Sequence, residues 1–121
     1  MEMKRKVHPT ISFQGKRNTI NIGVDVIRLL GEPTHICILR NFENKSVAIT
    51  SCEAEALMSF RVPDKFLTDR NSKFTVHSKQ FTQEVMGGCG LDTDKTYVFP
   101  GEYVPKNNMV VFMLQTADAG E

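Results

Sequence analysis

The sequence has no strong excess of one charge, few cysteines and no long hydrophobic run, and each absence excludes a class of protein. Fifteen lysines and arginines stand against fourteen acidic residues, a formal net charge of +1, so the domain as a whole is not a polyanion binder. The three cysteines are odd in number and widely spaced, which argues against a disulfide scaffold and predicts reduced thiols in a cytoplasmic protein. No apolar run approaches the roughly 20 residues of a membrane span, and the charged N-terminus lacks the apolar segment of a signal peptide.

The composition is that of an ordinary soluble domain. Hydrophobic residues make up 40% and charged residues 24% of the 121 residues. A chain of this length buries roughly two-thirds of its unfolded surface, which is enough for a core without disulfides or metal. We therefore expect one domain that covers residues 1–121, with no cofactor and no membrane segment.

Residues 18–50 change their hydrophobic period several times. Alternation predicts a strand over 19–22, and helical spacing predicts a short helix over 24–30. The run Gly31-Glu32-Pro33 is a typical helix stop, because glycine suits the position after the last turn and proline cannot continue the helix. Alternation then returns over 35–40 and 46–50, which predicts a hairpin with its loop at 41–45.

The second half of the chain repeats this order. A strand is predicted over 73–76, and Ser78 is a suitable N-cap for a helix over 79–86. The glycine-rich run 87–90 ends that helix. A strand at 96–99, a long turn at 100–108 and a partner strand at 109–114 complete the unit, and further short strands are predicted at 10–13 and 59–62. The predicted division is a basic leader 1–18, a first repeat 19–50, a connector 51–72, a second repeat 73–114 and a flexible tail 115–121.

A β-α-β-β unit has an apolar side that it cannot cover alone, so two copies are expected to pair about a pseudo-twofold axis. The predicted fold class is α+β and β-dominated, a double β-α-β-β barrel with two short helices. The barrel is expected either to close within a monomer with internal pseudo-symmetry or to assemble further as a homo-oligomer through an exposed edge strand.

This pattern resembles a known superfamily. A strand, a short helix ending in "LG" and a hairpin resemble the swapped-hairpin barrels of the AbrB and MazE DNA-binding proteins, and two units in one chain resemble MraZ. The motif that carries the resemblance is "INIGVDVIRLLG", residues 20–31, in which Gly23-Val24 stands where the family has a proline. Residues 61–66, "RVPDKF", are similar to the family's entry from strand to helix. The resemblance implies a small bacterial DNA-binding transcriptional regulator or antitoxin-like protein without catalytic activity.

Candidate phosphate contacts lie in the leader and beside it. Each lysine or arginine that neutralises a phosphate adds salt-dependent affinity that does not depend on base sequence. The candidate nucleic-acid-binding residues are Lys4, Arg5, Lys6, Lys16, Arg17 and Arg28. The competing interpretation is a solvated, disordered N-terminus and a protein-interaction or accessory module that does not bind nucleic acid. A continuous basic face favours DNA as the partner, and a mixed face favours a protein.

The cysteines and histidines do not predict a metal site or a nucleophile. They lack C-x-x-C and H-x-x-x-H spacings, and the one close pair, His35 and Cys37, shares a strand face and leaves a zinc site short of ligands. We expect Cys37 to be a small core residue. Cys89 follows a helix, where the negative end of the dipole raises a thiol pKa and disfavours both a nucleophile and a phosphate cradle.

The remaining candidates have structural interpretations. Asp92 and Asp94 lack the glycine and the distal glutamate of an EF-hand loop, so they predict a turn. Aromatic residues can stack on bases in single-strand binders, but at strand spacing they are usually packed in the sheet or core. That interpretation applies to Phe13, Phe60, Phe66 and Phe74. No catalytic residue is predicted.

Overall fold

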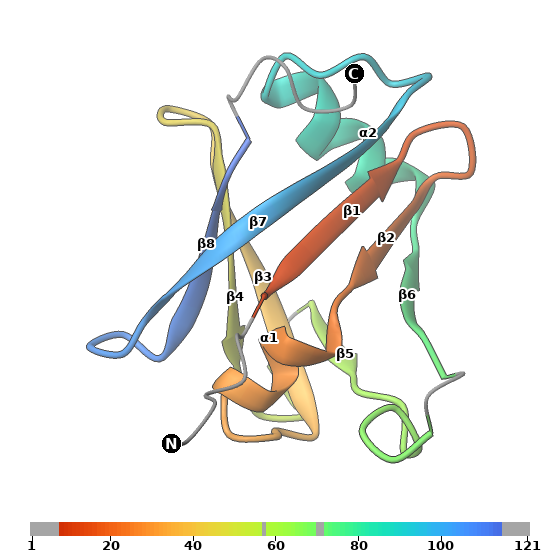
Figure 1. Cartoon of the computed structure of the whole chain (residues 1–121). Helices are drawn as coiled ribbons and strands as arrows, with labels where there is room; N and C mark the ends of the chain where they lie inside the picture. Colours follow the sequence, from red (N-terminus) through yellow and green to blue (C-terminus); the bar gives the residue numbers. More distant parts are fainter. Residues whose placement is uncertain (1–7, 57, 70–71, 115–121) are drawn as a thin grey trace, which may run out of the picture.

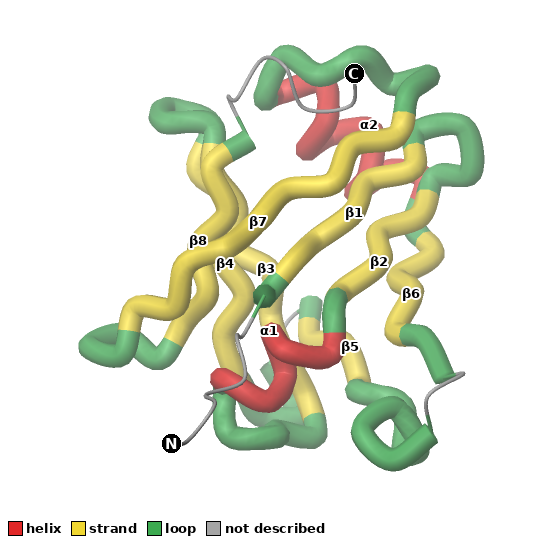
Figure 2. Tube along the Cα trace, in the orientation of Figure 1, coloured by secondary structure: helices red, strands yellow, loops and turns green. Residues whose placement is uncertain are grey.

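The computed structural model describes residues 8–56, 58–69 and 72–114. They form a β-dominated fold, a nearly closed antiparallel barrel of eight strands with two helices (Figure 1). The elements are β1 (Thr10–Gln14), β2 (Thr19–Ile22), α1 (Val24–Leu29), β3 (His35–Asn41), β4 (Ser46–Ser51), β5 (Ser59–Arg61), β6 (Phe74–His77), α2 (Lys79–Gly88), β7 (Thr96–Val104) and β8 (Met109–Met113). The two helices lie at opposite ends of the barrel (Figure 2). Neither helix is long and apolar enough to cross a membrane, as far as the described residues extend.

The barrel consists of two halves with the same order of elements, strand, strand, helix, strand, strand. The first half is β1-β2-α1-β3-β4 and the second is β5-β6-α2-β7-β8. The strand order around the barrel is β5-β3-β4-β8-β7-β1-β2-β6. Closed into a ring, this order is mapped onto itself when the two halves are exchanged, and the hairpins of one half pair with strands of the other. The halves therefore interleave, and each covers the apolar side of the other.

The barrel is open at one place. Strands β1 and β2 form a hairpin with a four-residue turn, in which Ile11 lies opposite Ile22. The equivalent strands of the second half, β5 and β6, are joined by residues 62–73, and among the described residues no pairing connects them. Both strands are therefore edge strands, and they border the only gap in the described strand order.

The inward side chains fill the barrel. Alternate residues of β1 and β2, such as Phe13 and Ile20, are fully buried, as the period of two predicts. Phe13 and Phe99 meet edge to face, with ring centroids 6.2 Å apart. Phe66 and Phe74 are also buried and pack edge to face at 5.7 Å. The structure thus confirms packing for these rings, and Phe60 is partly buried against the same core.

Both helices end in the same way. The N–H of Gly31 donates to Arg28 O at 3.1 Å, and the next N–H donates to Ile27 O at 2.9 Å, which is a Schellman motif. The second helix repeats it through Gly90, whose N–H donates to Gly87 O at 3.2 Å. Gly31 and Gly90 have φ angles of 89° and 78°, a left-handed conformation that glycine adopts without strain. The predicted stop at Gly31 is confirmed, and Ser78 caps α2 by accepting the N–H of Phe81 at 3.2 Å.

Three sequence predictions are wrong in detail. Strand β7 continues to Val104, so the long turn predicted from residue 100 is only the short turn at 105–108. At Pro100 the strand exchanges β1 for β8 as its partner, which accommodates a residue without an N–H. Helix α2 extends through Gly87 and Gly88, two residues beyond the predicted end. Cys37 is half-buried on the outer face instead of in the core, because Ile36 and Ile38 take the inward positions.

Candidate nucleic-acid interface

One corner of the barrel brings together three segments that are far apart in the sequence: the β1–β2 turn, the start of α2 and the loop before β7. The N–H of Gly15 donates to Lys95 O at 3.0 Å, and the N–H of Ser78 donates to Asn18 O at 3.3 Å. Gln83 on α2 donates from Nε2 to Asn18 Oδ1 at 2.7 Å. These bonds hold the turn, the helix and the loop in a fixed arrangement.

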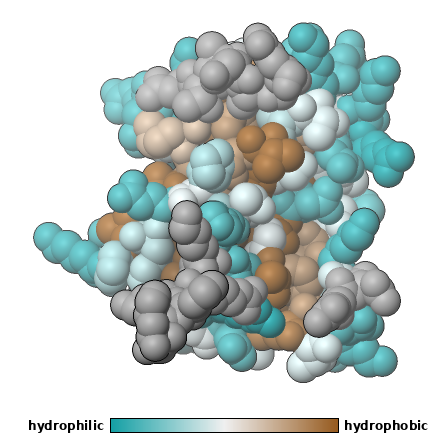
Figure 3. All heavy atoms as spheres, in the orientation of Figure 1, coloured by the Kyte–Doolittle hydropathy of each residue, from teal (hydrophilic) through white to brown (hydrophobic). Residues whose placement is uncertain are grey.

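We call this region the basic corner and define it by its cations. They are Lys16, Arg17, Lys79 and Lys95, and all four side chains are exposed. Asp92 and Asp94 lie in the same loop, so four positive charges face two negative ones. The first turn of α2 adds the positive end of its dipole. In Figure 3 the outline of the upper right corner, where the turn and the loop lie in Figure 1, is hydrophilic.

The β1–β2 turn approaches the loop too closely for any side chain at Gly15. A Cβ built there would lie 2.0 Å from Thr93 O. The turn ends at Asn18, whose φ of 55° is left-handed, a conformation that asparagine tolerates better than most residues. The corner is therefore a packed junction on which Lys16 and Arg17 are presented to solvent.

The structure separates the residues that the sequence predicted as phosphate contacts. Lys16 and Arg17 belong to the basic corner, whereas Arg28 lies on α1 at the other end of the β1–β2 hairpin. The strand between them spans on the order of 15 Å at roughly 3.3 Å per residue. Lys4, Arg5 and Lys6 lie outside the described residues. His8, the first described residue, donates its N–H to Asp25 Oδ2 at 2.9 Å, so the chain enters the barrel at the α1 end.

Arg28 belongs to a second corner, equivalent to the basic corner under exchange of the two halves. There the longer connection 62–73 takes the place of the β1–β2 turn, and Arg28 Nη2 donates to Leu67 O at 3.4 Å. A hollow of about 880 Å³ opens beside it, lined by Thr10, Ser12, Asn21, Arg28, Asp69 and Lys73 among others. Arg28 and Lys73 thus face a carboxylate and several neutral polar groups. Among the described residues that line the hollow, the excess is one positive charge, compared with two at the basic corner.

Sequence reasoning missed Lys79 and Lys95. The N-cap Ser78 already predicted that Lys79 begins a helix, so the sequence did predict the place of Lys79 on α2. The sequence could not predict that Lys79 lies next to the β1–β2 turn, because this depends on the pairing of β2 with β6, where Thr19 lies opposite His77. Lys95 joins them only because its carbonyl accepts the N–H of Gly15.

Arg40 and Asp94, two further charged residues, have local partners. Arg40 forms an ion pair with Glu84 at 2.8 Å and lies over the ring of Phe81, 5.3 Å from its centroid. The N–H of Asp94 donates to Asp92 Oδ1 at 2.9 Å, which is the turn that the sequence predicted. Arg40 is therefore bound to α2 and does not extend the basic corner.

The thiols and histidines do not gather into a metal site. Within the described residues no group of three or more histidines, cysteines, aspartates or glutamates could hold a metal ion. Cys89 is buried, and this burial raises the pKa of its thiol, while the charge of Lys45 lowers it to a smaller extent. A raised thiol pKa makes Cys89 a poor nucleophile, in agreement with its place after the end of α2.

Comparisons of the chain with protein-family models, with curated proteins and with solved structures find no match.

Proposed function

We propose that the protein is a small, non-catalytic DNA-binding protein, a transcriptional regulator or antitoxin-like protein built as a duplicated swapped-hairpin barrel of the AbrB and MraZ kind. It contacts the phosphate backbone through the basic corner. The observation that carries this proposal is the fixed meeting of three separate segments that presents Lys16, Arg17, Lys79 and Lys95 at one site.

The basic corner has the chemistry that a polyanion requires. Its cations are exposed and form no ion pair with other described residues, so they can release counterions from a phosphate backbone. Lys16 and Arg17 sit on a hairpin turn, a shape that can reach into a groove. Since the net charge is only +1, binding must come from this local patch and depend strongly on salt. Lys4, Arg5 and Lys6 are proposed to add phosphate contacts from the leader.

A fluorescence anisotropy titration with a labelled duplex of about 20 base pairs tests the proposal at low salt. If all four cations of the basic corner contact phosphates, they contribute about −3.6 to the slope of log K against log salt, and three leader contacts would add up to about −2.7. In the double variant Lys16→Gln and Arg17→Gln, affinity falls and the slope becomes shallower by about 1.8. No binding at tens of micromolar protein, or binding without salt dependence, contradicts the proposal.

A matched control separates the basic corner from net charge. Lys65 and Lys106 are exposed cations that lie outside the basic corner. The double variant Lys65→Gln and Lys106→Gln removes the same charge and is expected to keep the wild-type slope. An equal loss in both double variants means that binding follows the overall charge and not the basic corner.

A second candidate is a protein-interaction module without nucleic acid. It is favoured by exposed apolar side chains on and beside β3, because Leu39 is 47%, Phe42 42% and Met58 55% exposed. They lie where the pairing of β3 with β5 ends at Cys37, while its pairing with β4 continues to Asn41. If Leu39→Ser abolishes association with a partner and Lys16→Gln does not, this second function replaces the first.

A further inference from the structure

Two of the three cysteines lie next to each other on the outer face of the sheet. Cys37 is in β3, opposite Thr50 of β4. Cys52 follows the end of β4, and its N–H donates to His35 O at 3.1 Å. Because alternate residues of a strand share a face, Cys52 lies diagonally across from Cys37 on the same side. The pKa of the Cys52 thiol is raised in part by its interaction with the Cys37 side chain, which agrees with this placement of the two thiols side by side.

The third cysteine is separate from this pair. Cys89 is only 3% exposed and caps the C-terminus of α2, whereas Cys37 and Cys52 are half-buried and reachable from solvent. The chain therefore contains an accessible thiol pair and, as an internal reference, one enclosed thiol.

We propose that Cys37 and Cys52 are a redox modification site that closes to an intramolecular disulfide on reaction with a low-molecular-weight disulfide such as oxidised glutathione. In the first step one cysteine thiolate attacks a glutathione sulfur, the S–S bond breaks, and one glutathione thiolate leaves. In the second step the other cysteine attacks the protein sulfur of the mixed disulfide and expels the second glutathione. Two protein thiols lose two electrons and two protons, and oxidised glutathione is reduced to two glutathione molecules.

The order of the two attacks follows from the surroundings of Cys52. The pKa of Cys52 is raised to about 11, mainly by burial and further by its interaction with the Cys37 side chain. A thiol that holds its proton so firmly is a poor first nucleophile. The first attack therefore falls to Cys37, and Cys52 resolves the mixed disulfide, because it lies diagonally across from Cys37 on the same face of the sheet.

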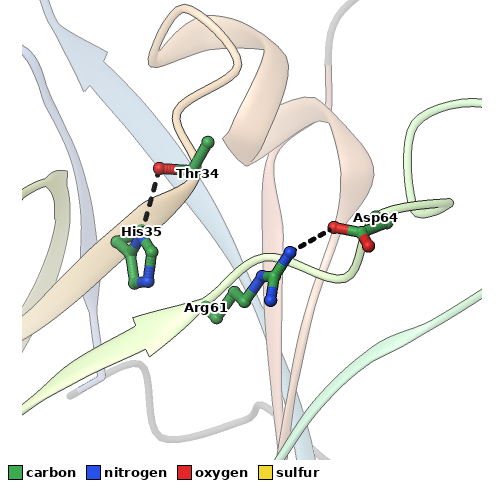
Figure 4. Close-up of polar contacts among 4 residues, drawn as sticks. All are labelled: Thr34, His35, Arg61 and Asp64. Atoms are coloured by element: carbon green, nitrogen blue, oxygen red, sulfur yellow. Dashed lines mark hydrogen bonds and ion pairs between the residues drawn. The ribbon is translucent and has the colours of Figure 1, made fainter. Parts of the chain in front are cut away.

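The charged neighbours of the pair are engaged elsewhere. His35 lies opposite Arg61 of β5. Figure 4 shows that Arg61 pairs with Asp64, at 2.8 Å, and that His35 Nδ1 lies 3.0 Å from Thr34 Oγ1. Both side chains are thus held by partners other than the thiols, in agreement with the raised pKa of Cys52. We expect slow oxidation, complete within hours rather than seconds.

The new bond would tie the residue that follows β4 to β3. This anchors the beginning of the segment that leads to β5, one of the two strands at the open gap of the barrel. Oxidation is therefore expected to act on the edge of the gap and to leave the basic corner unchanged, because that corner is built from other segments.

Incubation of the folded, full-length protein with oxidised glutathione at pH 8, followed by thiol titration in denaturant and a non-reducing peptide map, tests the inference. The expected result is a fall from three thiols to one, a covalent link between the peptides of Cys37 and Cys52, and full reversal by dithiothreitol. The remaining thiol is Cys89. Three intact thiols, a disulfide between two chains, or a link that includes Cys89 would overturn it.

Two variants keep the test decisive. Cys52→Ser removes the resolving thiol, so Cys37 is expected to accumulate as a stable glutathione adduct. Cys89→Ser is expected to form the Cys37–Cys52 link like the wild type, with no thiol left over. If Cys52→Ser remains unmodified under conditions that oxidise the wild type, Cys37 is not the first nucleophile and the proposed order is overturned.

Discussion

The two halves of the barrel share their framework and differ at their corners. Both helices end in a Schellman motif on a glycine, and in both the fifth residue after the N-cap donates a hydrogen bond to the strand–strand connection of the other half. Arg28 donates to Leu67 O in one half, and Gln83 donates to Gly15 O at 3.5 Å in the other. The connections themselves differ. A four-residue turn closes the β1–β2 hairpin, whereas β5 and β6, which residues 62–73 join, are not paired with each other within the described chain.

This difference separates what the barrel needs from what the proposed DNA binding uses. The shared features fix helix ends and strand order, which the interleaved core requires. The short connection makes the basic corner, a packed junction that presents cations. The long connection makes the opposite corner, with a hollow and an open edge. The proposed DNA binding therefore belongs to the basic corner, and the shared framework provides stability.

The largest expected effect is at the tight junction of the basic corner. Gly15→Ala places a Cβ 2.0 Å from Thr93 O, a backbone atom that cannot move without the loop, so we expect a loss of about 3 kcal/mol in the free energy of unfolding. Urea denaturation measures it. Gly87→Ala is the control, because nothing lies within 4 Å of its Cβ and alanine favours helix. Equal midpoints for Gly15→Ala and the wild type would contradict the junction.

The next prediction concerns one cross-strand pair whose side chains differ in size between the two halves. Gly101 lies opposite Phe112 in the second half, where the equivalent pair of the first half is Ile38 and Ile49. Gly101→Ala brings a Cβ to 2.4 Å from Phe112 Cε2 and is expected to cost about 2 kcal/mol. Adding Phe112→Leu should relieve the clash, with a coupling of about 1 kcal/mol in a double-mutant cycle. Strictly additive losses would mean that the two positions do not compensate each other.

A smaller effect distinguishes the two helix starts. Ser78 caps α2 with its side chain, whereas Gly23, the N-cap of α1, has no side chain that could form a cap bond. Ser78→Ala is expected to lower stability by about 1 kcal/mol, and Ser78→Asp should retain most of it, because aspartate also accepts the N–H of Phe81. Thermal unfolding of the three proteins decides. An alanine variant as stable as the wild type would show that the cap contributes nothing.

The smallest effect is a pH dependence that belongs to the first half. The pKa of the Cys52 thiol rises from 9.0 to about 11 on folding, so the folded state holds its proton longer than the unfolded state. The stability that this provides is complete below pH 9 and is lost as the pH rises through 11. We expect the wild type to lose more stability than Cys52→Ser between pH 8 and about 10.5, as measured by urea midpoints. Parallel losses in both proteins would contradict the raised pKa.

Local signals predicted the elements well. Alternation placed β2 at Thr19–Ile22, and Ser78 and Gly31 marked a helix start and a helix end, because each signal acts within a few residues. The end of β7 and the outward position of Cys37 were missed, since both depend on which strand lies alongside. The sequence could not predict that Lys79 and Lys95 lie at the same corner as the β1–β2 turn. It follows from the β2–β6 pairing and from contacts across the barrel.

A two-dimensional ¹H–¹⁵N NMR titration with a short DNA duplex tests the central claim most directly, because it reports where the duplex binds. We predict that amide shifts concentrate on the turn at 15–18, on the first turn of α2 and on residues 92–95, and that they fade as salt is added. Shifts confined to the hollow beside Arg28 or to Leu39 and Phe42, or no shifts at all, would contradict the assignment of binding to the basic corner.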